Sequence, residues 1–369
     1  MSRIVSFLDA IRGRPDDDAP RLIFADWLDE QGDPRGEFIR VQCALARQPG
    51  FDQPGQPFGI DLSSLLGIPA GLLGHADVFR RQAADAVNDP RGQALEAQSH
   101  RLLEQHLDAW LWPWRMTQAG WSFHRGLLRI TAEAEDFLRV AGAAPEAVDW
   151  LDQLTLANVT RPAVQCLAGC PHLPRAVRLE MQCRSVGPEG ASLLAASPHM
   201  ARLTRLYARR NQIGDAGAAA LAASPGLPRI TWLDLSCNEI GPAGAAALAE
   251  LPHLPLLTSL ILNDNELGAV GAAALAGSPL LARLAELGLS ANDVGDAGAA
   301  ALAASPFVAG LAQLGLGSNS ISEAGAAALA DSPRLAGLAH LNLSWNPDIG
   351  ANGAALLRGR FGRRVEVHA

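Results

Sequence analysis

The chain has 369 residues, 49% of them hydrophobic and 18% charged, which is the composition of a folded globular protein and not of a disordered one. Its net charge of −8 argues against binding to nucleic acid or to an anionic membrane surface, because both need a basic field. All 30 basic residues are arginine, so the lysines used by phosphate-binding loops and Schiff-base enzymes are missing.

The sequence shows no signal for export or membrane insertion. Asp9 interrupts the apolar stretch at the N-terminus, which argues against a signal peptide, and no run of about 18 apolar residues is present. The five cysteines are an odd number in a long chain, which indicates reduced thiols. We therefore expect a cytoplasmic protein.

Residues 1–47 predict three helices. The first lies near Ile4–Arg12, the second follows an acidic run at Asp16–Asp18 and ends at Gly32, and the third begins after Asp33-Pro34. The acidic run is a candidate metal site by residue type. Carboxylates on adjacent residues point in different directions, however, so we interpret the run as a helix cap.

The pieces PDDDAPRL, ADWLDEQGD and R-x-E-F-I-R follow one another in this module. The module resembles the bacterial repeat-companion domain over nearly its whole length, through the string SFLDAIRGRPDDDAPRLIFADWLDEQGDPRGEFIRVQCALAR. The resemblance implies a small all-α domain that stands before leucine-rich or other repeats, and it implies no chemistry.

Residues 48–150 predict an insertion followed by a helical junction. The stretch 48–98 begins with many prolines and glycines and is expected to be a loop, and a helix is expected near His100–Trp112. The sequence HLDAWLWPWRMTQAGWSFHRGLLRITAEAEDFL resembles the segment that joins the companion domain to its repeats, which implies a cap over the first repeat. Its tryptophans are a candidate ligand box, but we interpret them as core and capping residues. They are Trp110, Trp112, Trp114 and Trp121.

The remainder of the chain repeats itself every 27 residues. A fixed asparagine marks six copies, at Asn211, Asn238, Asn265, Asn292, Asn319 and Asn346. Three leucine-type positions precede it in the pattern L-x-x-L-x-L-x-x-N, as Leu257, Leu260 and Leu262 precede Asn265. This period and pattern are those of leucine-rich repeats. Residues 151–369 therefore predict an α/β horseshoe with parallel strands inside and helices outside.

Each repeat is expected to supply one short strand and one short helix. In L-x-L the two leucines point to the same side, into the core, and the residue between them points out. The asparagine amide can satisfy backbone groups of neighbouring turns in a stacked ladder. An apolar residue two positions later returns to the core. An alanine-rich helix then follows, and a proline ends it in each copy, from Pro198 to Pro333.

The terminal repeats deviate from this pattern, as terminal repeats usually do. An irregular first strand is expected at Leu154 and Leu156, and a last strand at Val365–Val367. In an early copy Arg184 stands where the asparagine is expected, and the copy around Pro347 has one extra residue.

Residues 151–369 resemble the ribonuclease-inhibitor-like subfamily of leucine-rich repeats, which includes the Ran GTPase-activating proteins and the sensor arms of innate immune receptors. The resemblance implies protein binding on the concave face and rims, and so a non-catalytic scaffold. Regulation of a small GTPase is the alternative that the same resemblance leaves open.

Neither a catalytic nor a metal site is predicted. Cys166, Cys170, His172 and Cys183 have the side chains of zinc ligands. Because Pro171-His172 recurs at the same position of later repeats, we interpret His172 as a loop residue and Cys166 as a core residue. No G-x-S-x-G, H-E-x-x-H or glycine-rich phosphate loop is present. We expect no enzyme activity, no metal and no cofactor.

The outward strand positions and the turns after them give the candidate binding residues. Tyrosine, tryptophan and arginine are enriched where binding energy concentrates, and they gather in two neighbouring copies, with one tryptophan near the far end. The candidates are Arg205, Tyr207, Arg209, Arg210, Trp232, Asp234 and Trp345. The alternative is that they are merely solvated. We expect a monomer that binds another protein presenting carboxylates, with neither nucleic acid nor membrane as partner.

Overall fold

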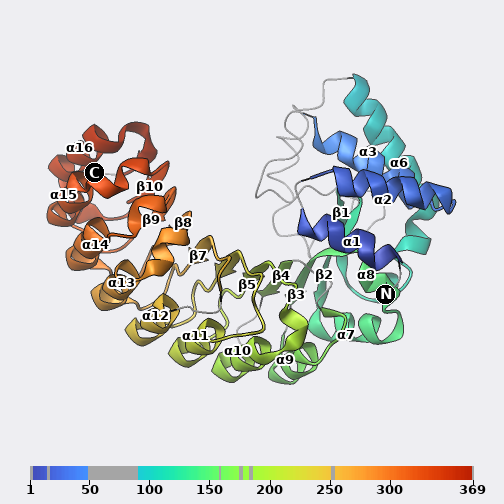
Figure 1. Cartoon of the computed structure of the whole chain (residues 1–369), viewed down its shortest axis with the longest axis horizontal. Coiled ribbons are helices and arrows are strands. Elements are labelled where there is room, and N and C mark those ends of the chain that lie inside the picture. The colour runs from blue at the N-terminus through green and yellow to red at the C-terminus, as the bar shows by residue number, and fades with distance from the viewer. Residues whose placement is uncertain are drawn as a thin grey trace. The chain divides into compact units, whose positions relative to one another are not determined.

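The computed structural model describes residues 3–14, 17–48, 90–157, 159–173, 178–182, 186–250 and 254–367. The chain divides into two compact units (Figure 1). The first comprises Met1–Thr155 with Arg175–Val177, and the second comprises Leu156–Pro174 with Arg178–Ala369. In the described part of the chain, no helix is long and apolar enough to cross a membrane.

The first unit combines helices with three strands. Its helices are α1 (Arg3–Gly13), α2 (Ala19–Glu30), α3 (Arg35–Ala46), α6 (Pro90–Trp110), α7 (Ala134–Ala143) and α8 (Glu146–Asp149), with a 3-10 turn at Trp114–Met116. Its strands are β1 (Gly120–His124), β2 (Leu127–Glu133) and β3 (Leu151–Ala157). Strands β1 and β2 form an antiparallel hairpin, and β2 lies next to β3.

The three helices predicted for residues 1–47 are confirmed, and the cap of the second differs in detail. Gly32 ends α2 with a φ of +70°, a conformation that glycine adopts without cost. The side chain of Asp18 makes no capping bond, and Asp17 instead accepts a hydrogen bond from the backbone N–H of Ala19 at 2.9 Å. Asp16 lies outside the described residues.

The β1–β2 hairpin is a feature that the sequence did not predict. Its turn is made by Arg125 (φ +47°) and Gly126 (φ +84°), whereas the strong hairpin signals are Asn-Gly and Asp-Gly. Helix α6 also differs, since it begins at Pro90, ten residues before the expected start. Residues 90–98 are therefore helical and not a loop, with proline at a helix start, where its missing N–H costs nothing.

Two apolar clusters hold the first unit together. One surrounds Phe24 and joins α1, α2 and α3 to Leu127 of β2. The other surrounds Phe38 and joins α3 to α6, with Trp110 and Trp121 packed against it. Of the remaining predicted core tryptophans, Trp114 is buried, but Trp112 is 65% exposed, so its assignment as a core residue was wrong.

The second unit is a regular solenoid. Its strands are β4 (Arg178–Gln182), β5 (Arg205–Tyr207), β6 (Trp232–Asp234), β7 (Ser259–Ile261), β8 (Glu286–Gly288), β9 (Gln313–Gly315), β10 (His340–Asn342) and β11 (Val365–Glu366). Its helices are α9 (Arg161–Ala168), α10 (Gly187–Ala196), α11 (Gly214–Ala222), α12 (Pro242–Ala249), α13 (Gly268–Ala276), α14 (Gly295–Ala304), α15 (Glu323–Asp331) and α16 (Gly350–Phe361).

Strands β4 to β11 pair in parallel, and equivalent positions lie opposite one another, as Leu206, Leu233 and Leu260 do. The strands line one side of the solenoid and the helices the other (Figure 1). These three leucines are at most 2% exposed, because they point between the two layers. The predicted α/β solenoid with parallel strands is thus confirmed. The predicted last strand also pairs, with Val365 opposite Leu341.

Side chains at two fixed positions tie successive repeats together. The asparagines form the predicted ladder on the strand side. On the helix side a second ladder is present, which the repeat pattern did not lead us to expect. In five repeats the residue before the closing proline is a serine, and it donates its hydroxyl to a helix carbonyl of the preceding repeat, as Ser305 does to Ala276 and Ser332 to Ala303, both at 2.6 Å.

Candidate partner-binding surface

Strand geometry places the predicted binding residues on the side of the sheet that faces away from the helices. In β5 and β6 the central leucines, Leu206 and Leu233, are buried. Their neighbours Tyr207 and Trp232 are half-buried, and Arg205 is exposed. The register pairs Arg205 with Trp232 and Tyr207 with Asp234, so these four residues lie on one continuous surface.

An aromatic and cationic stack crosses three adjacent strands of this surface. The ring of Tyr207 on β5 stacks on that of Trp232 on β6, with centroids 5.9 Å apart and planes 28° apart. From the other side, the guanidinium of Arg178 on β4 lies 4.2 Å from the centroid of Tyr207. We call these three residues the Arg178 stack. A cation at this distance from a ring face is attracted by the ring electrons.

Arg178 belongs to this candidate surface but is not among the residues predicted from the sequence. It lies in the irregular copy whose asparagine is replaced by Arg184. A signal was nevertheless present, because Arg178 stands 27 residues before Arg205 and pairs with it in the sheet. Extending the repeat pattern back by one copy finds it.

The arginines around the stack differ in whether a carboxylate lies next to them. Among the described residues, Arg205 and Arg210 are exposed and have no carboxylate within 4.0 Å. Arg209 differs, because its guanidinium contacts Asp264 at 3.5 Å and donates to the thiol of Cys237 at 3.4 Å. The carboxylate of Asp234 accepts hydrogen bonds from the backbone and hydroxyl of Ser236, at 2.9 and 2.6 Å.

Beyond the stack the same surface becomes flat and then polar. Ile261 of β7 is only 8% exposed, and the next two strands carry Gly288 and Gly315 at the paired positions. A Cβ atom at Gly288 would lie 3.0 Å from the side chain of Asn263, so the surface is closely packed there. Gly288 is buried and Gly315 is half-buried.

One carboxyl group on this surface, that of Glu286, has a raised pKa. Burial raises the pKa of Glu286 on β8, and repulsion from Asp234 acts in the same direction, whereas a hydrogen bond with Ser259 opposes them. Glu286 is therefore a half-buried charge without a cationic partner in the described part of the chain.

Trp345 is not brought to the Arg178 stack. It follows β10, five repeats after the equivalent Arg210, and it is 80% exposed. Its φ of +61° is shared by Arg210, Cys237 and Asp264 at the same repeat position, so the left-handed turn belongs to the repeat. A tryptophan this exposed in a left-handed turn gains nothing from packing.

The zinc-type residues are not arranged as a metal site in the part of the chain that the structure describes, where no group of three potential ligands is found. Cys170 is buried, but Cys166 is exposed, so its assignment as a core residue was wrong. It lies on the outer face of α9, whose buried residues are Ala163, Val164 and Leu167. Cys183 lies outside the described residues.

Comparisons with known proteins agree with the repeat architecture. The family model described as "Leucine Rich repeat" matches residues 203–222, 230–249, 253–276, 284–303 and 338–357. No curated protein sequence matches the chain significantly.

Two solved structures are similar to parts of the chain at low identity. The tropomodulin C-terminal domain of Caenorhabditis elegans is 15% identical over 39% of this chain and 90% of that one, with a TM-score of 0.32. An internalin from Listeria monocytogenes is 17% identical over 61% of this chain and 68% of that one, with a TM-score of 0.37. With its 27-residue period, parallel strands and matched segments, the second unit has the leucine-rich repeat fold.

Proposed function

We propose that this protein is a non-catalytic scaffold that binds another protein on the strand-lined face of its repeats, centred on the Arg178 stack. The observation that carries the proposal is the stack itself. Three side chains of the types enriched at binding hot spots lie in contact across β4, β5 and β6. They are half-buried, so each is already held in place and loses little conformational freedom when a partner arrives.

The partner that suits this surface presents carboxylates beside an apolar group. Arg205 and Arg210 keep their guanidinium groups exposed and unpaired among the described residues, and a guanidinium can bind a carboxylate with two parallel hydrogen bonds. The rings of Tyr207 and Trp232 supply the flat apolar contact. The exposed Arg205 and Arg210 favour such a partner by attraction.

Further parts of the proposal concern the first unit and the compartment. Residues 1–47 resemble the bacterial repeat-companion domain, and we propose that identity for α1, α2 and α3. The four described cysteines, at positions 43, 166, 170 and 237, form no disulfide, which suits a reducing cytoplasm. We further propose a monomer that needs no cofactor.

The proposal is tested in two stages. The partner is first identified by cross-linking in the native host and mass spectrometry, then purified, and its affinity is measured by calorimetry. Changing Tyr207 and Trp232 together to alanine should weaken binding by at least about 2 kcal/mol, roughly 30-fold. The matched control is Gln313→Ala with His340→Ala, on the same face three and four strands along from Trp232, and it should bind normally.

Two results would contradict the proposal. Normal binding by the double variant, with lost binding by Trp345→Ser, would move the site to the turn after β10. A large stimulation of GTP hydrolysis by a small GTPase of the host would replace the scaffold with the regulatory alternative.

A further inference from the structure

Two arginines lie opposite one another on the strand-lined face of the second unit. Arg178 on β4 pairs in register with Arg205 on β5, so their backbones are about 4.8 Å apart. Among the opposed positions of the described strands from β4 to β11, no other pair carries two like charges. Like charges at opposed positions of a sheet repel one another. The next copies carry Trp232, Ser259 and Glu286 at this position, so the repeat itself does not require arginine there.

The guanidinium of Arg178 is directed towards the strand that carries Arg205. It lies 4.2 Å from the ring centroid of Tyr207, which belongs to β5. Arg205 stands two residues before Tyr207, and residues two apart on a strand point to the same side. Both guanidinium groups therefore belong to one small area of the face that points away from the helices.

Hydrogen-bond donors of this pair are unused among the described residues. The Nε–H of Arg178 is buried and has no acceptor there, and the nearest carboxylate, that of Glu180, is 3.9 Å from the guanidinium, too far for a hydrogen bond. Arg205 is exposed and has no carboxylate within 4.0 Å. The Arg178 side chain remains 31% exposed, so an acceptor from outside can reach it. The pair thus offers two adjacent positive charges, each with five N–H donors.

The surrounding charges favour a single compact anion. Glu180, Asp234 and Glu286 lie on the same face and would repel nucleic acid or another long polyanion. A carboxylate carries one negative charge, which leaves one of the two arginines unpaired. A phosphomonoester carries up to about two negative charges and three acceptor oxygens. It therefore matches both guanidinium groups at once, each of which can bind it through two parallel hydrogen bonds.

We infer that Arg178 and Arg205 together bind a phosphomonoester on a phosphorylated side chain of the protein partner. The inference rests on the proposed function, because it names one anionic group that the partner presents to this face. The rings of Tyr207 and Trp232 lie beside the arginines and would contact the residues next to the phosphorylated one. Recognition of a phosphorylated segment by clustered arginines is an established mode of protein binding.

N-acetyl-phosphoserine amide titrated into the full chain tests the inference, with the arginine Nε–H signals followed by NMR. Single Arg→Gln variants assign the signals of Arg178 and Arg205. The Nε–H of Arg178 is shielded from exchange with water by its burial, which keeps its signal observable. We expect saturable shifts of both signals. N-acetyl-aspartate amide carries a single charge and should bind at least about tenfold more weakly.

Variants then assign the contact. Arg205→Gln should weaken binding of the phosphoserine probe at least about tenfold, and it should fold normally because Arg205 is exposed. Arg178→Gln should weaken binding as well. The matched control is Arg283→Gln, at an exposed arginine of the same unit outside the strands, and it should bind the probe as the unaltered protein does.

Inorganic phosphate separates the two sources of the anion. If the phosphoserine probe binds more tightly than inorganic phosphate, the ligand is a phosphorylated side chain. If inorganic phosphate binds as tightly or more tightly, the site is one for free phosphate and the inference about the partner is wrong. The inference is also overturned if the phosphoserine and aspartate probes bind equally, if neither arginine signal shifts, or if Arg205→Gln leaves binding unchanged.

Failure of this inference can be told from failure of the proposed function. If the probe does not bind, but the double change of Tyr207 and Trp232 to alanine abolishes binding of the partner, the scaffold function stands without a phosphate site. If the probe binds at the two arginines, but the double variant keeps its partner, the anion site stands and the proposed centre of partner binding is wrong.

Discussion

The backbone N–H of Asn211 donates to the side-chain oxygen of Asn238 at 2.9 Å, although the two residues stand 27 positions apart. Asn238 in turn donates its own N–H to the side-chain oxygen of Asn265 at 2.9 Å, and its amide NH₂ to the carbonyl of Ala208 at 2.8 Å. Each asparagine thus satisfies backbone groups of the repeat before it, in a region from which water is excluded.

Asn238→Ala should lower the free energy of unfolding of the repeat unit by at least about 3 kcal/mol, because several buried backbone groups lose their partners at once. Urea unfolding followed by far-UV circular dichroism measures the change. Ser318→Ala, at an exposed position of the same turn in another repeat, should cost less than about 0.5 kcal/mol. Equal effects of the two changes would show that the ladder does not stabilise the solenoid.

Leu260→Asp tests the orientation of the strands. Leu260 is fully buried between Leu233 and Leu287 of the neighbouring strands, so a carboxylate there would be an unpaired buried charge. We expect a loss of several kcal/mol and unfolding of the adjoining repeats, measured by hydrogen exchange. The same change at Gln313, which is exposed on the opposite face of the sheet, should be tolerated. Near-normal melting of Leu260→Asp would contradict the assigned register.

Asp152 should stabilise the first unit in a pH-dependent way. Burial opposes its ionisation, but the nearby His124, whose Nδ1 lies 3.6 Å from the carboxylate, and the charges of Arg129 and Arg21 outweigh this, so the pKa of Asp152 lies well below its usual range. A carboxyl group whose pKa is lowered by folding stabilises the folded state at pH values above its unfolded-state pKa of about 3.9. This stabilisation is lost as the pH falls below that value. Asp152→Asn should therefore cost about 3 kcal/mol at pH 7.

The difference between Asp152→Asn and the unaltered protein should shrink as the pH falls below about 4. Tryptophan fluorescence in urea measures it, since six of the eight tryptophans lie in the first unit. Asp108→Asn, at an exposed carboxylate of α6, serves as the control and should show no such trend. A constant difference from pH 7 to pH 3 would mean that Asp152 is not ionised in the folded protein.

Glu286→Gln should raise the stability of the folded protein at neutral pH, whereas Asp152→Asn should lower it. Because burial raises the pKa of Glu286, its ionised form destabilises the fold at neutral pH, and the neutral amide removes that cost. We expect a small rise in melting temperature at pH 7 that disappears below about pH 4, where the glutamate is protonated in both folded and unfolded states. A fall in melting temperature at pH 7 would indicate a cationic partner for Glu286.

The sequence by itself determined the solenoid fold and the side of the sheet to which each strand side chain points. A 27-residue period needs no knowledge of distant contacts, and alternation along a strand dictates that Tyr207 and Trp232 share a face if Leu206 and Leu233 are buried. The three N-terminal helices could also be predicted from the sequence, because their boundaries are set by local residues such as Gly32.

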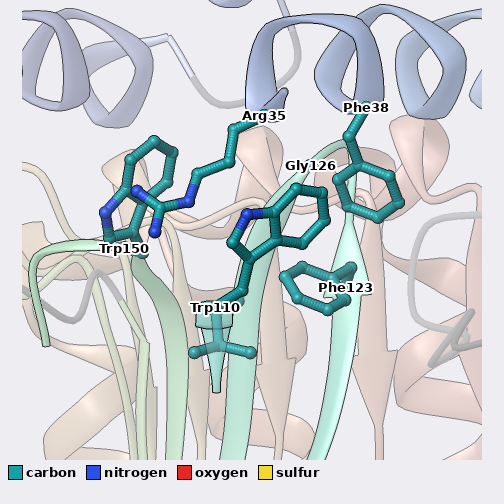
Figure 2. Close-up of a pocket in the computed structure, with 7 residues that line it drawn as sticks. Arg35, Phe38, Trp110, Phe123, Gly126 and Trp150 are labelled. Atoms are coloured by element: carbon teal, nitrogen blue, oxygen red, sulfur yellow. The ribbon is translucent and has the colours of Figure 1, made fainter. Parts of the chain in front are cut away.

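Tertiary structure alone decided how side chains from different parts of the chain meet. The placement of Arg178 over Tyr207 depends on strand pairing in a copy that departs from the pattern. One recess of the first unit is lined by Arg35, Trp110 and Trp150, which no local rule relates (Figure 2). The exposure of Cys166 and Trp112 likewise follows from which helix face or turn finds a neighbour. Periodicity specifies the direction of a side chain within its own element, whereas its contacts are set by packing between elements far apart in the sequence.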